Sequence, residues 1–166
     1  SHDVDGIGGE FQRRINDMSI LPPVVGAIDA IAREHKVLFQ DMNVLVVGEG
    51  ILVGAPARAY AESRGAHVSV ATKTSGTLQT LAQHADIIIL GSGVPGLLSA
   101  DMIKDGVVIF DAGTSEDGGK LSGDASPLCS EKALLFTPVP GCIGPITVAM
   151  LFKNLALLAI HGGKDK

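Results

Sequence analysis

A glycine-rich turn between an apolar strand and a helix constrains this chain more than any other feature of its sequence. Residues 43–47 form an apolar, β-branched run, and the spacing Gly48-x-Gly50-x-x-x-Gly54 follows at once. Glycine lets the backbone turn tightly there and lets a pyrophosphate approach the amino end of the next helix. The motif therefore predicts a dinucleotide-binding βα unit, and a plain tight turn in a fold with another ligand is the alternative.

Strand and helix patterns alternate along the chain, as is typical of βαβ units around a parallel sheet. The apolar runs of the strands suit a sheet that is buried on both faces. The length of 166 residues suits one domain, so we predict a single α/β, Rossmann-like, doubly wound domain of three layers, α/β/α. The predicted strands are 43–47, 67–71, 86–90, 107–111 and 134–138; the predicted helices are 24–35, 52–64, 77–84 (N-cap Thr77) and an amphipathic 146–160, with a helical turn at 99–103.

The ends of the chain and one internal segment fall outside this alternation. Ser1-His2 resembles a tag remnant, and residues 3–21, which show no clear period, predict an extended segment before a domain at 22–166. Residues 114–126 contain Gly118-Gly119, which predicts a hairpin or arm.

Charge and hydropathy argue against several classes of function. The net charge is −5 and the 13 Lys and Arg are scattered, whereas a nucleic-acid binder usually shows a basic stripe. No apolar run reaches the roughly 18 residues of a membrane span, and no signal peptide is visible. Cys129 and Cys142 form no CxxC pair, which favours a reduced, cytoplasmic compartment. The histidines at 35, 67, 84 and 161 show no ligand spacing, so no metal site is predicted.

Glycines also follow the third and fourth predicted strands. Ligands of open α/β sheets bind at the carboxyl ends of the strands, although such proteins need turns there in any case. The cofactor-contacting residues predicted from the three loops are Gly48, Glu49, Gly50, Ile51, Gly91, Ser92, Gly93, Asp111, Gly113 and Thr114.

The end of the second strand bears on the choice of cofactor. The acidic residue that would hold a ribose diol is missing, and Thr72-Lys73 stands in its place. Lys73 and the hydroxyls near it could hold a 2′-phosphate, which favours NADP, although a solvated surface lysine is the alternative. Glu49 would repel such a phosphate, so NAD remains the alternative cofactor.

Residues 137–151, TPVPGCIGPITVAML, place three prolines and two glycines before a helix, which predicts a rigid wall near the carboxyl edge of the sheet. This stretch resembles the closing signature of the methylenetetrahydrofolate dehydrogenase/cyclohydrolase family, TPVPGGVGPMTVAML. The segments DVDG at 3–6, VGEGILVGAP at 47–56 and KLSGD at 120–124 are similar to further segments of that family in the same order. The resemblance runs from residue 3 to about residue 160.

The resemblance implies the C-terminal NAD(P)-binding domain of a bifunctional enzyme. The parent activity oxidises 5,10-methylenetetrahydrofolate to 5,10-methenyltetrahydrofolate and hydrolyses that product to 10-formyltetrahydrofolate. The family's N-terminal domain carries a Tyr-x-x-x-Lys catalytic pair, but Tyr60 is the only tyrosine here and Arg64 follows it. No catalytic residue is therefore predicted, and we expect the chain to be inactive alone. A non-catalytic, nucleotide-sensing module is the alternative function.

The resemblance also implies roles for individual residues. Asp5 matches the carboxylate that holds the pterin, since a carboxylate can accept two hydrogen bonds from an aminopyrimidine edge; a solvated acid in the terminus is the alternative. Pro140 and Gly141 are expected on the folate side. Thr147 is expected either to cap the last helix or to contact the nicotinamide amide.

The chain departs from the family pattern at a few positions. The Arg-Ser of the family's glycine loop is Glu49-Gly50, and the second glycine of PVPGG is Cys142. No base is assigned to Cys142, so a nucleophilic role is not predicted. Members of the family are similar in pairing through the Rossmann domain, often by a protruding β-arm, which implies a homodimer with 116–124 as the arm.

Overall fold

The computed structural model describes residues 20–117 and 119–162. Its centre is a sheet of five parallel strands in the order β2-β1-β3-β4-β7. The strands are β1 (Asn43–Val47), β2 (His67–Ala71), β3 (Ile87–Leu90), β4 (Val108–Asp111) and β7 (Leu135–Phe136). This confirms the predicted doubly wound sheet, in which the chain reverses its direction across the sheet between β1 and β3.

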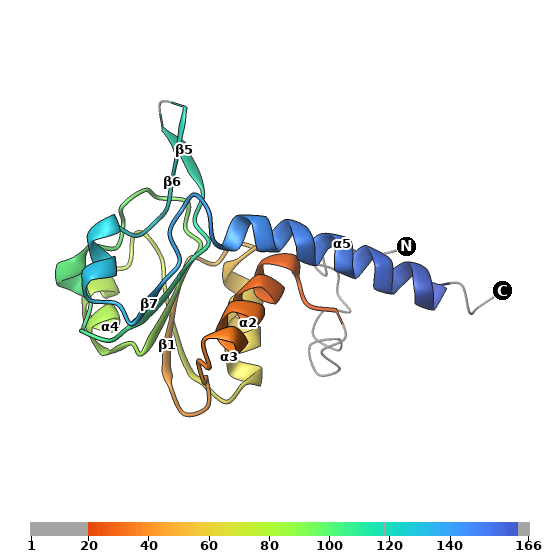
Figure 1. Ribbon diagram of the computed structural model, residues 1–166. Coiled ribbons are helices and arrows are strands. Elements are labelled where there is room, and N and C mark those ends of the chain that lie inside the picture. The colour runs from red at the N-terminus through yellow and green to blue at the C-terminus, as the bar shows by residue number, and fades with distance from the viewer. Residues whose placement is uncertain (1–19, 118, 163–166) are drawn as a thin grey trace.

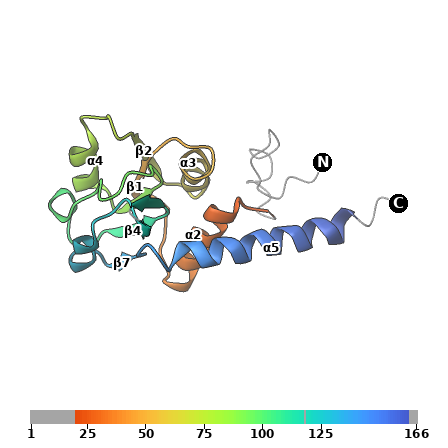
Figure 2. The same ribbon diagram turned by 90° about the horizontal axis from the view of Figure 1, so that it is seen from above.

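Helical elements cover both faces of the sheet (Figures 1 and 2). One apolar cluster joins alternate residues of β1, β3 and β4 to α2 (Pro23–Glu34) and α3 (Gly54–Ser63). The other cluster joins the intervening residues to α4 (Leu78–His84) and to the short helices η1 (Ala100–Met102) and η2 (Pro127–Glu131). Successive side chains of a strand point to opposite faces, so the apolar runs feed both layers. The predicted three-layer architecture is confirmed.

Two predicted helix starts are wrong. Helix α3 begins at Gly54 rather than at residue 52, because 51–53 complete the turn and Val53 is its N-cap. Helix α5 (Ile143–Gly162) begins three residues before the predicted start, with Pro145 in its first turn, where a missing N–H costs little. Thr147 therefore lies inside the helix and its hydroxyl donates to the Ile143 carbonyl at 2.9 Å, so its predicted capping role is wrong. Thr77 does occupy the N-cap of α4, but without a side-chain capping bond.

The prediction that the last helix is amphipathic is also wrong. Helix α5 packs along α2 near its start and then extends beyond the sheet (Figure 1). Large apolar side chains remain exposed on it, and Phe152 is 65 % exposed. The window Ile143–Ile160, although interrupted by Lys153 and Asn154, has a mean hydropathy of 1.8, so this one helix is long and apolar enough to cross a membrane. A single helix of this kind is weak evidence for a span, since core helices of soluble proteins pass the same test.

The predicted arm is confirmed as a hairpin. Strands β5 (Ser115–Asp117) and β6 (Lys120–Ser122) pair in antiparallel fashion and project from the body (Figure 1). Gly119 in its turn has a φ of +80°, a conformation that favours glycine.

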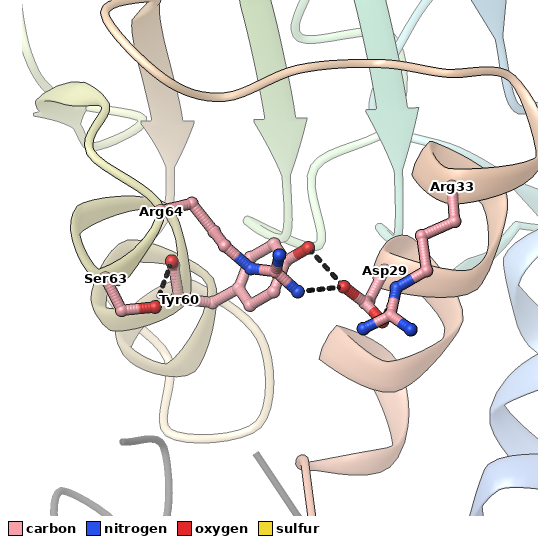
Figure 3. Close-up of polar contacts among 5 residues, drawn as sticks. All are labelled: Asp29, Arg33, Tyr60, Ser63 and Arg64. Carbon is pink, nitrogen blue, oxygen red and sulfur yellow. Dashed lines mark hydrogen bonds and ion pairs between the residues drawn. The ribbon is translucent and has the colours of Figure 1, made fainter. Parts of the chain in front are cut away.

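The only tyrosine ties α2 to α3 (Figure 3). The Tyr60 hydroxyl donates to Asp29 at 2.7 Å, and Arg64 pairs with the same carboxylate at 2.5 Å. Arg33 pairs with the other oxygen of Asp29 at 2.9 Å. Burial, and then the bond to Asp29, raise the pKa of Tyr60 far above its usual value. The Tyr60–Arg64 spacing therefore serves helix packing, and the phenol stays protonated.

Candidate functional site

The loops after β1, β3 and β4 meet at the carboxyl edge of the sheet and enclose a cavity of about 330 Å³. The position lies beside the reversal of strand order, where open α/β sheets bind their ligands. Seven of the residues predicted to contact a cofactor line this cavity: Gly50, Ile51, Gly91, Ser92, Gly93, Gly113 and Thr114. Leu52, Val53 and Ala112 complete the lining, and the sequence motif did not indicate them.

The glycines of the first loop have different structural demands. Gly48 has a φ of +105°, and a Cβ there would lie 2.6 Å from the Gly91 carbonyl oxygen. A Cβ on Gly54 would lie 2.1 Å from the Gly48 carbonyl oxygen, so Gly54 allows the helix to pack against the strand. A Cβ on Gly50 would meet nothing within 4 Å. Gly48 and Gly54 thus shape the turn, whereas Gly50 leaves open space over the start of α3, where a phosphate can approach.

The turn after β2 carries a cluster of hydroxyl groups. The Thr72 hydroxyl lies 3.0 Å from that of Ser75 and 3.1 Å from that of Thr74, and the Thr72 amide donates to Ser75. Lys73 is exposed beside them and has no ion-pair partner among residues 20–117 and 119–162. Thr72 and Lys73 lie outside the lining of the cavity.

Glu49 also stays outside the lining and is exposed to solvent. It lies close enough to Arg58 on α3 to influence that side chain. The pKa of Arg58 is raised chiefly by its hydrogen bond to Glu62, which spans 2.8 Å, and to a smaller extent by the charges of Glu62 and Glu49. Arg58 is thus already paired with Glu62, and Glu49 adds a weaker electrostatic influence.

Asp111, predicted to contact the cofactor, forms hydrogen bonds with the chain's own backbone. Its carboxylate, 1 % exposed, accepts from the backbone N–H groups of Gly113 at 3.0 Å, Asp124 at 3.2 Å and Ala125 at 2.9 Å. Burial raises the pKa of Asp111 to about 6, and these three donors oppose the rise. Asp111 thereby anchors the chain on both sides of the arm.

A second cavity of about 570 Å³ adjoins the first, with which it shares Leu52, Val53, Ala112 and Thr114. The stiff loop before α5 forms its wall, and the Val139–Pro140 peptide bond in that loop is cis. Pro140, Gly141 and Thr147, all predicted site residues, line this cavity together with Asp111. Cys142 lines it too, and burial raises the pKa of its thiol, so the thiol is protonated at neutral pH.

A third cavity of about 250 Å³ lies between the start of α2 and the side of α5, and Leu52 and Thr147 connect it to the second. The three cavities therefore form one continuous surface along the carboxyl edge. Asp5, the predicted pterin ligand, lies outside the described residues.

Comparison with known proteins agrees with this arrangement. Residues 22–161 match the model of the tetrahydrofolate dehydrogenase/cyclohydrolase family, NAD(P)-binding domain. The bifunctional protein FolD of Methanosarcina acetivorans is 38 % identical over 146 residues, which are 87 % of this chain and 50 % of that protein. FolD of Lactobacillus acidophilus is 36 % identical over 159 residues, which are 94 % of this chain and 56 % of that protein.

Solved structures give the same result. The bifunctional FolD enzyme of Campylobacter jejuni superposes with a TM-score of 0.85 at 31 % identity, over 92 % of this chain and 56 % of that one. The FolD of Trypanosoma brucei, complexed with NADP cofactor and inhibitor, gives a TM-score of 0.88 at 26 % identity, over 98 % and 59 %. The chain thus spans about half the length of the relatives it matches. It belongs to the tetrahydrofolate dehydrogenase/cyclohydrolase family and corresponds to the NAD(P)-binding domain of that family.

Proposed function

We propose that this domain holds NAD(P) for the oxidation of 5,10-methylenetetrahydrofolate and serves an enzyme that also hydrolyses the product to 10-formyltetrahydrofolate. The observation that carries the proposal is the continuity of the glycine-lined cavity with the cavity walled by the Pro-Gly loop. The open space over Gly50 suits a pyrophosphate, and the larger apolar cavity suits a flat ring system. The cofactor, when bound, accepts a hydride from the folate.

The chain's own groups would bind and orient the cofactor rather than react. Tyr60 is engaged between two helices and Cys142 is protonated, so neither offers a base or nucleophile to the cavities. We therefore expect the 166-residue chain to bind dinucleotide weakly and to lack dehydrogenase activity. Calorimetric titration with NAD⁺ and NADP⁺ tests the binding, and absorbance at the reduced-nicotinamide band tests the activity. Turnover of methylenetetrahydrofolate by the purified chain would contradict the proposal.

Cofactor preference gives a second prediction. We expect weaker discrimination in favour of NADP than the family pattern implies, because Glu49 stands where that pattern has arginine. An exposed pair between Lys73 and a phosphate is worth only about 0–1 kcal/mol, and lysine lacks the bidentate geometry of arginine. Glu49→Arg should shift the ratio of the two dissociation constants toward NADP by about tenfold. Lys73→Ala should weaken NADP⁺ binding more than NAD⁺ binding.

Glu34→Arg is the matched control, because it makes the same change of charge at an exposed position at the end of α2. It should leave the ratio unchanged. A wild-type chain that prefers NADP⁺ by several hundredfold would show that Glu49 does not oppose the phosphate.

We also propose a homodimer formed through the arm, in a reducing, cytoplasmic compartment. The compartment is supported by the two free thiols. The dimer is supported by the exposed Leu121 on β6 of a two-stranded sheet whose edges pair with no other strand of residues 20–117 and 119–162. Light scattering should give twice the mass of the 17.1 kDa chain. Leu121→Lys should lower that mass, whereas Leu128→Lys, at another exposed leucine on η2, should not. A wild-type monomer at high concentration would count against the dimer.

A further inference from the structure

Asp124, at the foot of the arm, is fully buried and reaches the loop after β3. One of its oxygens, Oδ2, accepts three hydrogen bonds from two residues of that loop. The donors are the Ser92 amide at 2.6 Å, the Ser92 hydroxyl at 2.8 Å and the Gly93 amide at 3.1 Å. Ser92 and Gly93 both line the first cavity, so a single carboxylate oxygen sets how this part of the cavity wall is oriented.

The backbone around Asp124 is itself held. Its amide donates to Asp111, and its carbonyl accepts from Leu98 at 3.0 Å. The loop has two further ties to the arm, since the Ser115 hydroxyl donates to the Gly93 carbonyl at 2.8 Å and the Gly96 amide to the Gly123 carbonyl at 3.2 Å. The backbone of Asp124 is therefore held in place by other bonds, so its carboxylate fixes the position of the loop after β3 and does not adapt to that loop.

The other oxygen of Asp124 points to a role beyond packing. Oδ1 is buried without a hydrogen-bond partner among the described residues, and it lies against Gly113, where a Cβ would come within 2.1 Å of it. A buried, half-satisfied carboxylate costs stability, and an apolar residue would avoid that cost. An apolar residue, however, would leave the amides of Ser92 and Gly93 without an acceptor.

We propose that Asp124 is a positioning residue for the dinucleotide. Asp124 accepts from the N–H groups of Ser92 and Gly93 and thereby turns them toward its own buried carboxylate. These bonds hold the loop after β3 in the conformation that contacts the ligand. The inference rests on the proposed function, because it concerns the same cavity. It also implies that the Ser92 and Gly93 amides do not bind the pyrophosphate, since Asp124 already accepts from both of them.

Two substitutions test this inference. Asp124→Ala removes the acceptor and should weaken NAD⁺ and NADP⁺ binding by about tenfold or more, the equivalent of one or two lost hydrogen bonds. Asp124→Asn should restore binding to within about threefold of wild type, because the amide oxygen can take the place of Oδ2 and the amide nitrogen that of the unpartnered Oδ1. Ser92→Ala, which removes one of the three bonds, should have an intermediate effect and covers the case in which Asp124→Ala does not fold.

Amide hydrogen exchange of the ligand-free chain gives a readout that is independent of binding. The Ser92 and Gly93 amides should lose protection in Asp124→Ala and keep it in Asp124→Asn. Asp86→Ala is the matched control, since Asp86 also accepts a backbone N–H, that of Asn43 at 2.8 Å, but at the opposite edge of the sheet. It should lower stability without changing dinucleotide affinity.

The outcomes separate the inference from the proposed function. Wild-type affinity in Asp124→Ala and Ser92→Ala, or an equal loss in Asp124→Asn and Asp124→Ala, would overturn the positioning role. A wild-type chain that binds neither dinucleotide would overturn the proposed function, whereas unchanged exchange at residues 92 and 93 in Asp124→Ala would overturn the inference on its own.

Discussion

Gly54→Ala is expected to lower the free energy of unfolding by about 3 kcal/mol or more, the upper end of the effect of overpacking. The added Cβ would lie 2.1 Å from the carbonyl oxygen of Gly48, 2.6 Å from the carbonyl carbon of Gly48 and 2.9 Å from the backbone nitrogen of Glu49. All three are backbone atoms, so no side-chain rotation can relieve the overlap. The start of α3 would have to move away from β1, which would also open the turn that we assign to the pyrophosphate. Urea unfolding measures the first effect and dinucleotide titration the second.

Gly50→Ala is the matched control in the same loop. Its Cβ would meet nothing within 4 Å, and Gly50 lacks the positive φ of Gly48. We expect stability to stay within about 0.5 kcal/mol of wild type while the new methyl group crowds the open space and weakens dinucleotide binding. Equal losses of stability in the two variants would contradict the assignment of Gly54 to packing and of Gly50 to the ligand.

The strands were predictable because the physical signal for them is local. The bounds of β1 and β2 agree with the prediction residue for residue, β3 and β4 each begin one residue later than predicted, and β7 covers only Leu135–Phe136 of the predicted 134–138. A parallel strand buried on both faces needs a continuous apolar run, which few other structures require. The glycine loop was predictable for the same reason, since its spacing and its place between strand and helix both lie within a dozen residues of sequence.

The start and the character of α5 were not predictable in this way. Prolines and glycines before residue 146 suggested a loop, yet Pro145 fits the first turn of a helix, which does not need its N–H. The helix is apolar on exposed sides as well, so its sequence does not distinguish the side that packs on α2 from the side that faces solvent.

Asp124 was missed for a different reason. Its partners Ser92 and Gly93 lie more than 30 residues away in the sequence, and only the folded arm brings them together. Asp124 ends the segment KLSGD, which resembles a segment of the family, but that local pattern does not reveal which residues the carboxylate contacts. Glu49 and Lys73 differ from Asp124, because the sequence alone shows their charges. The preference for NADP or NAD that these charges produce depends on a bound ligand, so it stays a prediction.

The second large effect is a dependence of stability on pH that arises from Asp111. Its pKa is raised from the ordinary 3.8 to about 6 in the folded chain, first of all by burial. Between these two values the folded state keeps the proton that the unfolded state has lost. Unfolding then releases a proton, so the contribution of Asp111 to stability falls as pH rises from about 4 to about 6 and is constant above that. A rise of about two pKa units corresponds to about 3 kcal/mol.

Other carboxyl groups act in the opposite direction, so the total curve is not the right measurement. The pKa of Asp86 is lowered, first by its hydrogen bond to Lys104, and the stability it contributes is lost as pH falls through that lowered value. The contribution of Asp111 is therefore the difference between wild type and Asp111→Asn. The amide keeps one acceptor oxygen but turns an NH₂ group toward the Ala125 amide, a cost that does not depend on pH.

Urea unfolding at pH 4, 5, 6 and 7 should show this difference as a slope. Relative to wild type, Asp111→Asn should gain stability with rising pH, by up to about 3 kcal/mol across the range, because the variant has no proton to lose. Asp86→Asn, the control, should leave the slope above about pH 5 unchanged, since the pKa of Asp86 is lowered from 3.8 and its stabilisation is lost only at more acidic pH. The carboxylate of Asp111 accepts a hydrogen bond from the Asp124 amide. When Asp111 loses its proton near pH 6, a negative charge therefore forms next to the residue that holds the β3 loop. Parallel pH curves for wild type and Asp111→Asn would mean that Asp111 titrates alike in the folded and unfolded chains, and that its burial is offset in full by its three backbone donors.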